Sequence, residues 1–393
     1  MQMVKLSSLV DRKIGYGIVQ PGQSTGKGIP VIKVNNIISG LKNVQSLDTT
    51  SPENDAKYMR TKLKGGELIV SVVGTIGKTA IVPHSFAGCN LVRATALVDI
   101  PNQNICRWVK YYIDSPDGQQ YIKQNLNTTV QPTLNIQDLA EMPIPLPDEK
   151  EIARIVRILF SIDQNIECNQ AINDNLEQQA ASYFYRLFIE NPSSEWREGT
   201  ISDLGTVVGG STPSKAKPEY YTDHGIAWIT PKDLSLNKSK FISHGENDIT
   251  ELGLKNSSAA IMPEGTVLFS SRAPIGYIAI AASQVCTNQG FKSVVPASNI
   301  GTAFVYYFLK YNLPIIEGMA SGSTFKEISG STMKSVPAII PDDASLAQFD
   351  DFCRPIFDQQ RTLEAQNQYL SSLRDTLLPK LMSGEIDVSE IRI

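Results

Sequence analysis

The sequence contains few of the residue types from which metal sites and secreted or membrane proteins are built. Its 393 residues include five cysteines and three histidines, and no two cysteines form a Cys-x-x-Cys pair, so a zinc site is not expected. No apolar run approaches the roughly 20 residues that cross a bilayer, and the N-terminus lacks the pattern of a secretory signal. We therefore expect a cytoplasmic protein with reduced, buried thiols and no membrane segment.

Motifs of catalysis are also missing. Gly74-Thr-Ile-Gly77-Lys78-Thr79 approaches a phosphate-binding loop, but Val72 stands where that pattern requires glycine, so a β-turn is the better interpretation. The Asn-Pro dipeptide Asn191-Pro192 lies at a predicted helix exit and lacks the second proline that a DNA methyltransferase motif needs. No clustered carboxylates suit a nuclease metal site. We expect no catalytic residue and no metal ligand in this chain.

Charge is distributed unevenly along the chain, although the net charge is only −4. Residues 1–147 hold 15 Lys+Arg against 10 Asp+Glu, and residues 199–341 hold 11 against 10, which sums to +6. Residues 148–190 hold 4 against 8, and residues 342–384 hold 4 against 7, which sums to −7. A basic surface on the globular stretches would attract phosphate, even though the whole chain is acidic.

The most informative feature is an internal repeat of about 195 residues. Met142-Pro-Ile-Pro-Leu-Pro147 corresponds to Val336-Pro-Ala-Ile-Ile-Pro341 at an offset of 194. Further upstream, Ser71-Val-Val-Gly-Thr-Ile-Gly77 matches Ser270-Ser-Arg-Ala-Pro-Ile-Gly276. Each half therefore follows one plan: a globular region, a proline-marked exit and a long polar helix.

The two predicted helices share one hydrophobic register. After Asp148, which can cap a helix with Glu151, apolar residues recur with three-four spacing, and the second copy repeats every position at an offset of 194. Such spacing over five heptads predicts an antiparallel coiled coil of helices roughly 60 Å long. Asn173 and Asn367 share one seam position, which suggests control of register or a partner surface. An ordinary amphipathic helical domain is the alternative, which the matched register disfavours.

The globular regions are predicted to be mixed α/β domains, each with a curved sheet. Strand-like runs in the first half are Ile29–Ile37, Glu67–Val73, Thr79–Val82 and Ala94–Ile100, and 107–126 is mainly helical with a break near Pro116. The second half repeats this with strands at Ile226–Thr230, Thr266–Ser271 and Tyr277–Ala281 and a helix around 302–310. The expected fold is two similar α/β domains separated by two long helices in an antiparallel coiled coil with pseudo-two-fold symmetry.

The chain resembles the specificity subunits of type I restriction-modification systems over nearly its whole length. The resemblance rests on Gly209-Gly-Ser-Thr-Pro-Ser-Lys215, on Ile226-Ala-Trp-Ile-Thr-Pro-Lys-Asp-Leu234, on the two proline exits and on the ending 377–386. The first domain departs from the pattern, because it shows only Gly15-Tyr-Gly17 near the place of the glycine-rich opening.

This resemblance implies a division of the chain into recognition and spacing parts. Target-recognition domains at 1–147 and 199–341 would each read one half of a bipartite double-stranded DNA site. Spacer helices at 148–190 and 342–384, with a linker at 191–198 and a tail at 385–393, would set the gap and dock two methylation subunits. Those partners would use S-adenosylmethionine, and restriction motor-nuclease subunits would use ATP with magnesium. The chain itself would bind no cofactor and would act as a non-enzymatic subunit.

Candidate DNA-contacting residues are loop cations, which position a protein on phosphates, and amides or arginines, which read base edges. In the first domain these are Lys33, Asn35, Asn36, Lys78, Arg93 and Gln131. In the second domain they are Lys215, Lys217, Lys232, Arg272, Asn288, Gln289 and Lys326.

Three other functions stay open at this point. A specificity subunit of a methylation-only or related phage-defence system would have the same sequence features, because the difference lies in the partner genes. A self-contained methyltransferase or nuclease would require cofactor binding by the isolated chain. A non-DNA coiled-coil scaffold would show no DNA retardation even with partners present.

Overall fold

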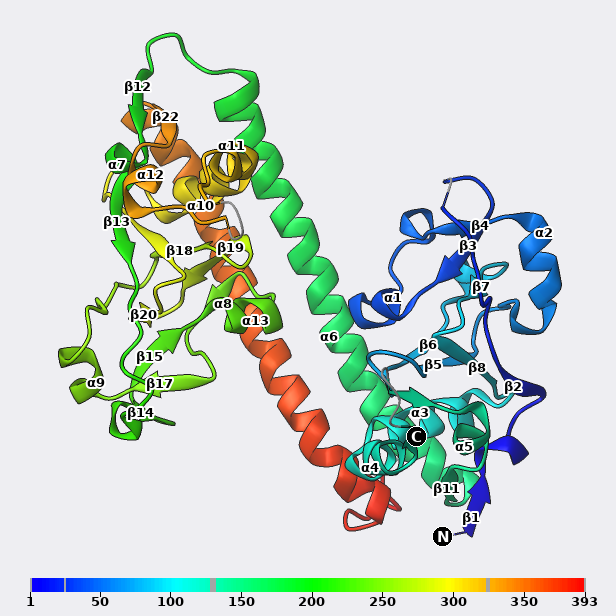
Figure 1. Ribbon diagram of the computed structural model, residues 1–393. Helices are drawn as coiled ribbons and strands as arrows, with labels where there is room; N and C mark the ends of the chain where they lie inside the picture. Colours follow the sequence, from blue (N-terminus) through cyan, green and yellow to red (C-terminus); the bar gives the residue numbers. More distant parts are fainter. Residues whose placement is uncertain (1, 25, 128–131, 323–325, 392–393) are drawn as a thin grey trace. The chain divides into compact units, whose positions relative to one another are not determined.

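The structure is a computed structural model that describes residues 2–24, 26–127, 132–322 and 326–391. The chain divides into two compact units, of which the first is made of two stretches of sequence and the second of one. Unit 1 comprises residues 1–164 and 370–393, and unit 2 comprises residues 165–369. Each unit therefore contains one globular region and parts of both long helices (Figure 1). None of the described helices is long and apolar enough to cross a membrane.

Unit 1 is built on two small sheets. A four-stranded antiparallel sheet has the order β2-β8-β5-β6 and contains β2 (Arg12–Tyr16), β8 (Thr95–Asp99), β5 (Leu68–Ser71) and β6 (Thr79–Ile81). A three-stranded sheet has the order β4-β3-β7 and contains β4 (Thr49–Thr50), β3 (Ile29–Ile32) and β7 (Asn90–Leu91). Two further antiparallel pairs are formed by β1 (Gln2–Lys5) with β11 (Pro143–Leu146) and by β9 (Leu126–Asn127) with β10 (Thr133–Leu134).

Helices of unit 1 begin at residues that can cap them. Asn102 and Ser115 accept backbone hydrogen bonds at the starts of α3 (Gln103–Asp114) and α4 (Pro116–Gln124), so the predicted break near Pro116 is confirmed. The buried face of α3 carries Trp108 into the core. The shorter helices are α1 (Val34–Ser39), α2 (Pro52–Asp55) and α5 (Ile136–Ala140).

The strand predicted at Ile29–Ile37 is wrong in its second half. Strand β3 ends at Ile32, and the chain then turns into helix α1 at Val34. The side-chain oxygen of Asn36 accepts a hydrogen bond of 2.8 Å from the Lys33 backbone N–H, which stabilises the first helical turn. This local capping outweighs the β propensity of Val34 and Ile37.

Unit 2 repeats both sheets and extends each by one strand. The larger sheet has the order β13-β21-β18-β19-β16 and contains β13 (Gly205–Gly209), β21 (Lys292–Pro296), β18 (Val267–Ser271), β19 (Ile275–Ala281) and β16 (Phe241–Ile242). The smaller sheet has the order β14-β17-β15-β20 and contains β14 (Tyr221–Thr222), β17 (Asn247–Ile249), β15 (Ile226–Ile229) and β20 (Cys286–Thr287). A separate pair joins β12 (Arg197–Thr200) to β22 (Pro337–Ile340).

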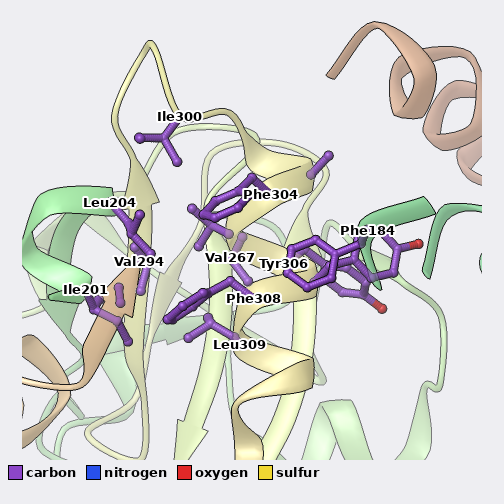
Figure 2. Close-up of a cluster of buried hydrophobic side chains, with 14 of the residues drawn as sticks. Phe184, Ile201, Leu204, Val267, Val294, Ile300, Phe304, Tyr306, Phe308 and Leu309 are labelled. Atoms are coloured by element: carbon purple, nitrogen blue, oxygen red, sulfur yellow. The ribbon is translucent and has the colours of Figure 1, made fainter. Parts of the chain in front are cut away.

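The core of unit 2 forms where α10 (Thr302–Tyr311) packs against the larger sheet. Figure 2 shows Phe304 and Phe308 of this helix beside Val267 and Val294 of the strands, and all four are at most 5% exposed. The other short helices are α7 (Ile201–Leu204), α8 (Pro231–Leu236), α9 (Glu251–Lys255), α11 (Leu313–Gly318) and α12 (Gly330–Lys334). The sheets of unit 2 thus repeat the strand order of the sheets of unit 1, so the sequence repeat is also a repeat of topology.

The long helices α6 (Glu149–Phe184) and α13 (Asp343–Ser383) run antiparallel within each unit. In unit 1, Asp163 accepts a hydrogen bond from Arg374, and Ile152, Ile155 and Leu159 share a core with Leu378 and Leu381. In unit 2, the Asn169 and Asn367 side chains are joined by a 2.9 Å hydrogen bond, and Gln360 donates to the Asn173 carbonyl oxygen. The predicted antiparallel pairing and its polar seam are therefore confirmed.

Each long helix follows directly on a capping aspartate and ends near the predicted residue. Asp148 and Asp342 each accept a 2.9 Å hydrogen bond from a backbone N–H three residues ahead. A π-helical turn, Tyr185–Glu190, continues α6 up to Asn191. Helix α13 stops at Ser383, and Gly384 follows with a φ of 77°, a conformation that glycine adopts without strain.

Candidate functional site

The candidate site of unit 2 lies where two parallel strands end side by side. Trp228 pairs with Cys286 and Ile229 with Thr287, so β15 and β20 point the same way. The chain leaves β15 through Thr230 into helix α8 and leaves β20 through Asn288, whose N–H donates to the Ile229 carbonyl oxygen. Polar side chains that follow the two strands are therefore brought together, although 58 positions separate Thr230 from Asn288.

An open hollow of about 720 Å³ lies over these strand ends. Its lining includes five of the residues predicted from sequence to contact DNA, namely Lys215, Lys232, Arg272, Asn288 and Gln289. These five come from four separate stretches of sequence, so the fold gathers them. Cations with amides in one hollow can contact phosphate oxygens and the hydrogen-bonding edges of bases.

Aromatic side chains hold one wall of the hollow in place. Trp228 donates a 3.0 Å hydrogen bond from its indole nitrogen to the Ser211 carbonyl oxygen, and Tyr221 donates one of 2.6 Å to the Pro213 carbonyl oxygen. Their rings pack edge to face with centroids 5.8 Å apart. The tryptophan motif and the glycine-rich motif are thus two parts of one wall, with Lys215 following directly on it.

Asp233 ties the start of helix α8 to the neighbouring strand. One carboxylate oxygen accepts hydrogen bonds of 2.7 and 2.6 Å from the Thr230 backbone and hydroxyl, and the other accepts one of 2.8 Å from the Glu246 backbone N–H. Asp233 is buried, at 7% exposure, and both of its carboxylate oxygens accept hydrogen bonds from within the protein. Its role is to fix the helix that presents Lys232.

Carboxylates pair with two of the cations at this site. Lys232 lies 2.5 Å from Glu246, and this hydrogen bond raises the pKa of the exposed lysine. Arg272 lies 3.4 Å from Glu327, on the segment that bridges to its strand end. Lys292 lies 3.9 Å from the same Glu327, and burial lowers the pKa of this lysine. The hollow therefore combines cations with acceptors, and it is not uniformly basic.

Unit 1 places its candidates at the equivalent strand ends. Val31 pairs with Asn90 and Ile32 with Leu91, so β3 and β7 form the same parallel pair as β15 and β20. Counting from these pairs, Asn35 is equivalent to Lys232 and Arg93 to Gln289, and both are exposed. Lys33 takes the place of Thr230 and pairs at 2.6 Å with Asp48, whose pKa the lysine hydrogen bond lowers.

A glycine brings a third strand against the end of each parallel pair. A Cβ at Gly210 would lie 1.9 Å from the Asn288 carbonyl oxygen, and a Cβ at Gly17 would lie 2.1 Å from the Leu91 carbonyl oxygen. The following residues, Ser211 and Ile18, then donate backbone hydrogen bonds to Thr287 and Leu91. Gly17 therefore serves unit 1 as Gly210 serves unit 2, although the surrounding motif is absent from the first domain.

The other candidates are more scattered. Lys78 is exposed in the turn between β5 and β6, which Ser71 closes with hydrogen bonds to Lys78 and Thr75, so the β-turn interpretation is confirmed. Exposed Lys217, paired with Glu219, and exposed Lys326 do not line the hollow of unit 2. Gln131 lies outside the described residues.

Asn36 uses its side-chain oxygen to cap α1, as Asp233 does in α8. The sequence prediction missed Glu246 and Asn247, which line the hollow from the start of β17. No motif marks that segment, so only its pairing with β15 brings it there. Among the described residues, no group of three His, Cys, Asp or Glu could hold a metal ion.

Sequence comparisons show a family match over most of the chain. The family model described as the type I restriction modification DNA specificity domain matches residues 1–178 and, a second time, residues 193–374. The chain is 41% identical over 179 residues to the type I restriction enzyme MjaIX specificity subunit of Methanocaldococcus jannaschii, covering 43% of this chain and 41% of that relative. It is 32% identical over 195 residues to the EcoBI specificity subunit of Escherichia coli, covering 47% and 40%.

The chain thus spans about two fifths of the length of these two relatives. A longer alignment joins it to the putative MjaX specificity subunit of M. jannaschii, with 22% identity over 92% of this chain and 88% of the relative. Among solved structures, the type I restriction-modification S subunit from M. genitalium superposes with a TM-score of 0.59 at 16% identity, covering 97% of this chain and 95% of that one. This last likeness concerns the fold.

Proposed function

The chain belongs to the family of type I restriction-modification DNA specificity domains, as a specificity subunit with two such domains in tandem, and we propose that each domain reads one half of a bipartite double-stranded DNA target. The observation that carries this proposal is the hollow of unit 2, where five predicted DNA-contacting residues meet. The equivalent strand ends in unit 1 carry Asn35 and Arg93, which supports a second reading site.

Four of the five residues of the hollow have a role in this proposal that follows from their exposure or their hydrogen bonds. Lys215 and Lys232 are exposed and suit phosphate contacts, which set the position of the protein on the duplex. Gln289 accepts a hydrogen bond from the Thr212 hydroxyl, which orients its amide. Its amide nitrogen then remains a donor toward a base edge, and Arg272 offers a forked pair of donors.

The partners and cofactors of the complex are also proposals. The long helices, whose sequence segments sum to −7, would set the gap between the half-sites and dock two methylation subunits. S-adenosylmethionine would be used by those subunits, and ATP with magnesium by motor-nuclease subunits in a restriction complex. This chain would contribute recognition without catalysis, and the complex would act in the cytoplasm.

The test is to co-express the full chain with its methylation subunit and to sequence host DNA by a method that detects modified adenines. A split motif that is modified only when this chain is present is the expected result. Replacing the Lys232, Arg272 and Gln289 side chains with alanine should change one half of that motif and leave the other half intact. Replacing Asn35 and Arg93 should change the opposite half. A folded, assembled complex that modifies no motif would refute the proposal.

A further inference from the structure

Two partly buried clusters of polar side chains, outside both reading sites, join a globular region to the helix pair. In unit 1, the hydroxyl of Tyr111 on α3 donates a 2.7 Å hydrogen bond to Asp163 on α6. The second oxygen of Asp163 accepts a 2.9 Å hydrogen bond from Arg374 on α13. Three elements thus meet at one carboxylate, which we call the Asp163 joint.

Unit 2 contains a related cluster, in which a tyrosine, a carboxylate and a cation again meet. The hydroxyl of Tyr307 on α10 donates a 2.9 Å hydrogen bond to Glu177 on α6. Lys240 lies 2.5 Å from Glu177 and donates a 2.6 Å hydrogen bond to Gln360 on α13. We call this cluster the Glu177 joint. In both units, therefore, a tyrosine from the helix that covers the sheet binds a carboxylate of α6, and a cation links that carboxylate to α13.

The two tyrosines belong to corresponding helices of the two units. Tyr111 and Tyr307 are each 3% exposed, and each lies on the helix that packs on its unit's larger sheet. Burial raises the pKa of both phenols, so each hydroxyl keeps its proton and acts as a donor. The two carboxylates, in contrast, lie at different positions of α6, so the two joints are built from non-equivalent residues of that helix.

The charged groups of the Glu177 joint compensate one another. Burial disfavours the charged form of Glu177, but Lys240 and Lys310 outweigh it and lower the pKa of this carboxyl group to about 2. Lys240 itself is 5% exposed at its side chain, and burial lowers the pKa of this lysine. Apolar side chains could stabilise this contact with the helix equally well. Hydrogen bonds to charged groups have defined directions, so this cluster also fixes the orientation of the globular region on the helix.

A short path of chain connects the Glu177 joint to the reading site. Helix α8 begins in the wall of the hollow and ends at Leu236, and four residues later Lys240 enters the joint. The backbone N–H groups of Lys240 and Phe241 also donate hydrogen bonds of 2.8 and 3.0 Å to Glu364 on α13. The edge strand β16 is therefore fixed directly to the helix that would act as the spacer.

We propose that the Asp163 and Glu177 joints are positioning elements that fix the direction of each recognition domain on the helix pair and thereby the permitted gap between the two half-sites. This inference rests on the proposed function, since it assigns the joints to the same bipartite recognition. The joints touch neither reading site, so they should affect how exactly the gap is measured and not which bases are read.

The experiment compares Tyr111→Phe and Tyr307→Phe with the neighbouring changes Tyr112→Phe and Tyr306→Phe, each in the full chain assembled with its methylation subunits. Phenylalanine keeps the ring and removes only the hydroxyl, so the cores are retained. Each complex modifies a DNA library in which the half-sites found for the natural chain are separated by gaps of every length. Sequencing of the modified adenines gives the gap distribution and the half-site sequences together.

We expect the joint variants to keep both half-sites and to raise modification at gaps one base pair shorter or longer by roughly tenfold relative to the neighbouring controls, because a hydrogen bond to a charged group is lost. An unchanged gap distribution with an intact motif would overturn the joint proposal alone. A natural chain that directs no modified motif would overturn the proposed function and this inference with it. If Tyr111→Phe abolished assembly, Asp163→Glu would provide the same comparison, because it keeps the charge while moving the carboxylate.

Discussion

The adjacent glycines Gly209 and Gly210 allow a sharp test of how the reading site is built. A Cβ at Gly210 would lie 1.9 Å from one backbone oxygen and 2.4 Å from another, on Asn288 and Thr287. A Cβ at Gly209 would meet nothing closer than 3.9 Å, at the end of the Lys292 side chain. Gly210→Ala should therefore disrupt the junction of β13 and β20, whereas Gly209→Ala is its matched control.

The expected cost of Gly210→Ala follows from the contacts that must open. Van der Waals contact requires the two backbones to separate by more than 1 Å, and such overpacking costs about 1–3 kcal/mol. The separation also weakens the hydrogen bonds from Gly210 to Phe291 and from Ser211 to Thr287, at about 1 kcal/mol each. The free energy of unfolding of unit 2 should fall by about 3–5 kcal/mol. Gly209→Ala should leave it unchanged or raise it by about 0.5–1 kcal/mol, since alanine restricts the unfolded chain.

Urea unfolding of the full chain, followed by circular dichroism, measures both variants against the natural protein. The first unit supplies an independent copy of the experiment, because Gly17→Ala places a Cβ 2.1 Å from the Leu91 oxygen, whereas Gly15→Ala places one 3.8 Å from its nearest neighbour. If Gly210→Ala unfolded within about 0.5 kcal/mol of Gly209→Ala, the close approach of β13 to β20 would be refuted. Equal destabilisation by both changes would show that the loss of stability comes from strand propensity and not from the close contact at Gly210.

The remaining predictions concern DNA binding, acid stability and spacing. Arg272→Ala should lower affinity for the cognate site and, if the contact is to a phosphate, reduce the salt slope by about 0.9; binding measured at several salt concentrations checks this, with exposed Lys255→Ala as control. Since the folded-state pKa of Glu177 lies near 2 and the ordinary value is 4.5, its stabilising effect should be complete above pH 4.5 and disappear as the pH falls toward 2. The stability difference between the natural chain and Glu177→Gln, measured across that range, should therefore shrink with acid; a constant difference would contradict the ion-pair argument. Adding one heptad to both long helices should lengthen the unread gap in the target, and an unchanged gap would remove the spacer role while leaving DNA binding intact.

Sequence patterns predicted the regular parts of this protein well, because those parts are specified locally. Capping residues and a three-four apolar spacing determine helices α6 and α13 without reference to the rest of the chain. The break at Pro116 follows from proline geometry alone. Val34–Ile37 was predicted wrongly, because its two β-branched residues are also compatible with a short helix once the Asn36 side chain caps it.

The reading site was predicted only in part. Lys232, Arg272 and Gln289 were predicted as a loop cation and base-reading side chains, but their meeting in one hollow depends on the parallel pairing of β15 with β20. Glu246 and Asn247 carry no sequence signal of their own. The joints could not be predicted from the sequence, because they depend on contacts between distant segments. Tyr111 and Asp163 are 52 residues apart, and no periodicity links a buried hydroxyl to a particular carboxylate.

By itself the sequence determined the duplicated plan, the helix register and the uneven charge, since each is a property of spacing along the chain. Tertiary structure decided which of many exposed cations share a surface, why Gly17 replaces a whole motif in the first unit, and where buried charges hold each globular region to its helices. The physical reason is that hydrogen bonds and ion pairs between distant segments depend on strand order and backbone approach. Neither is encoded in the pattern of any single segment, because both arise only when the sheets assemble.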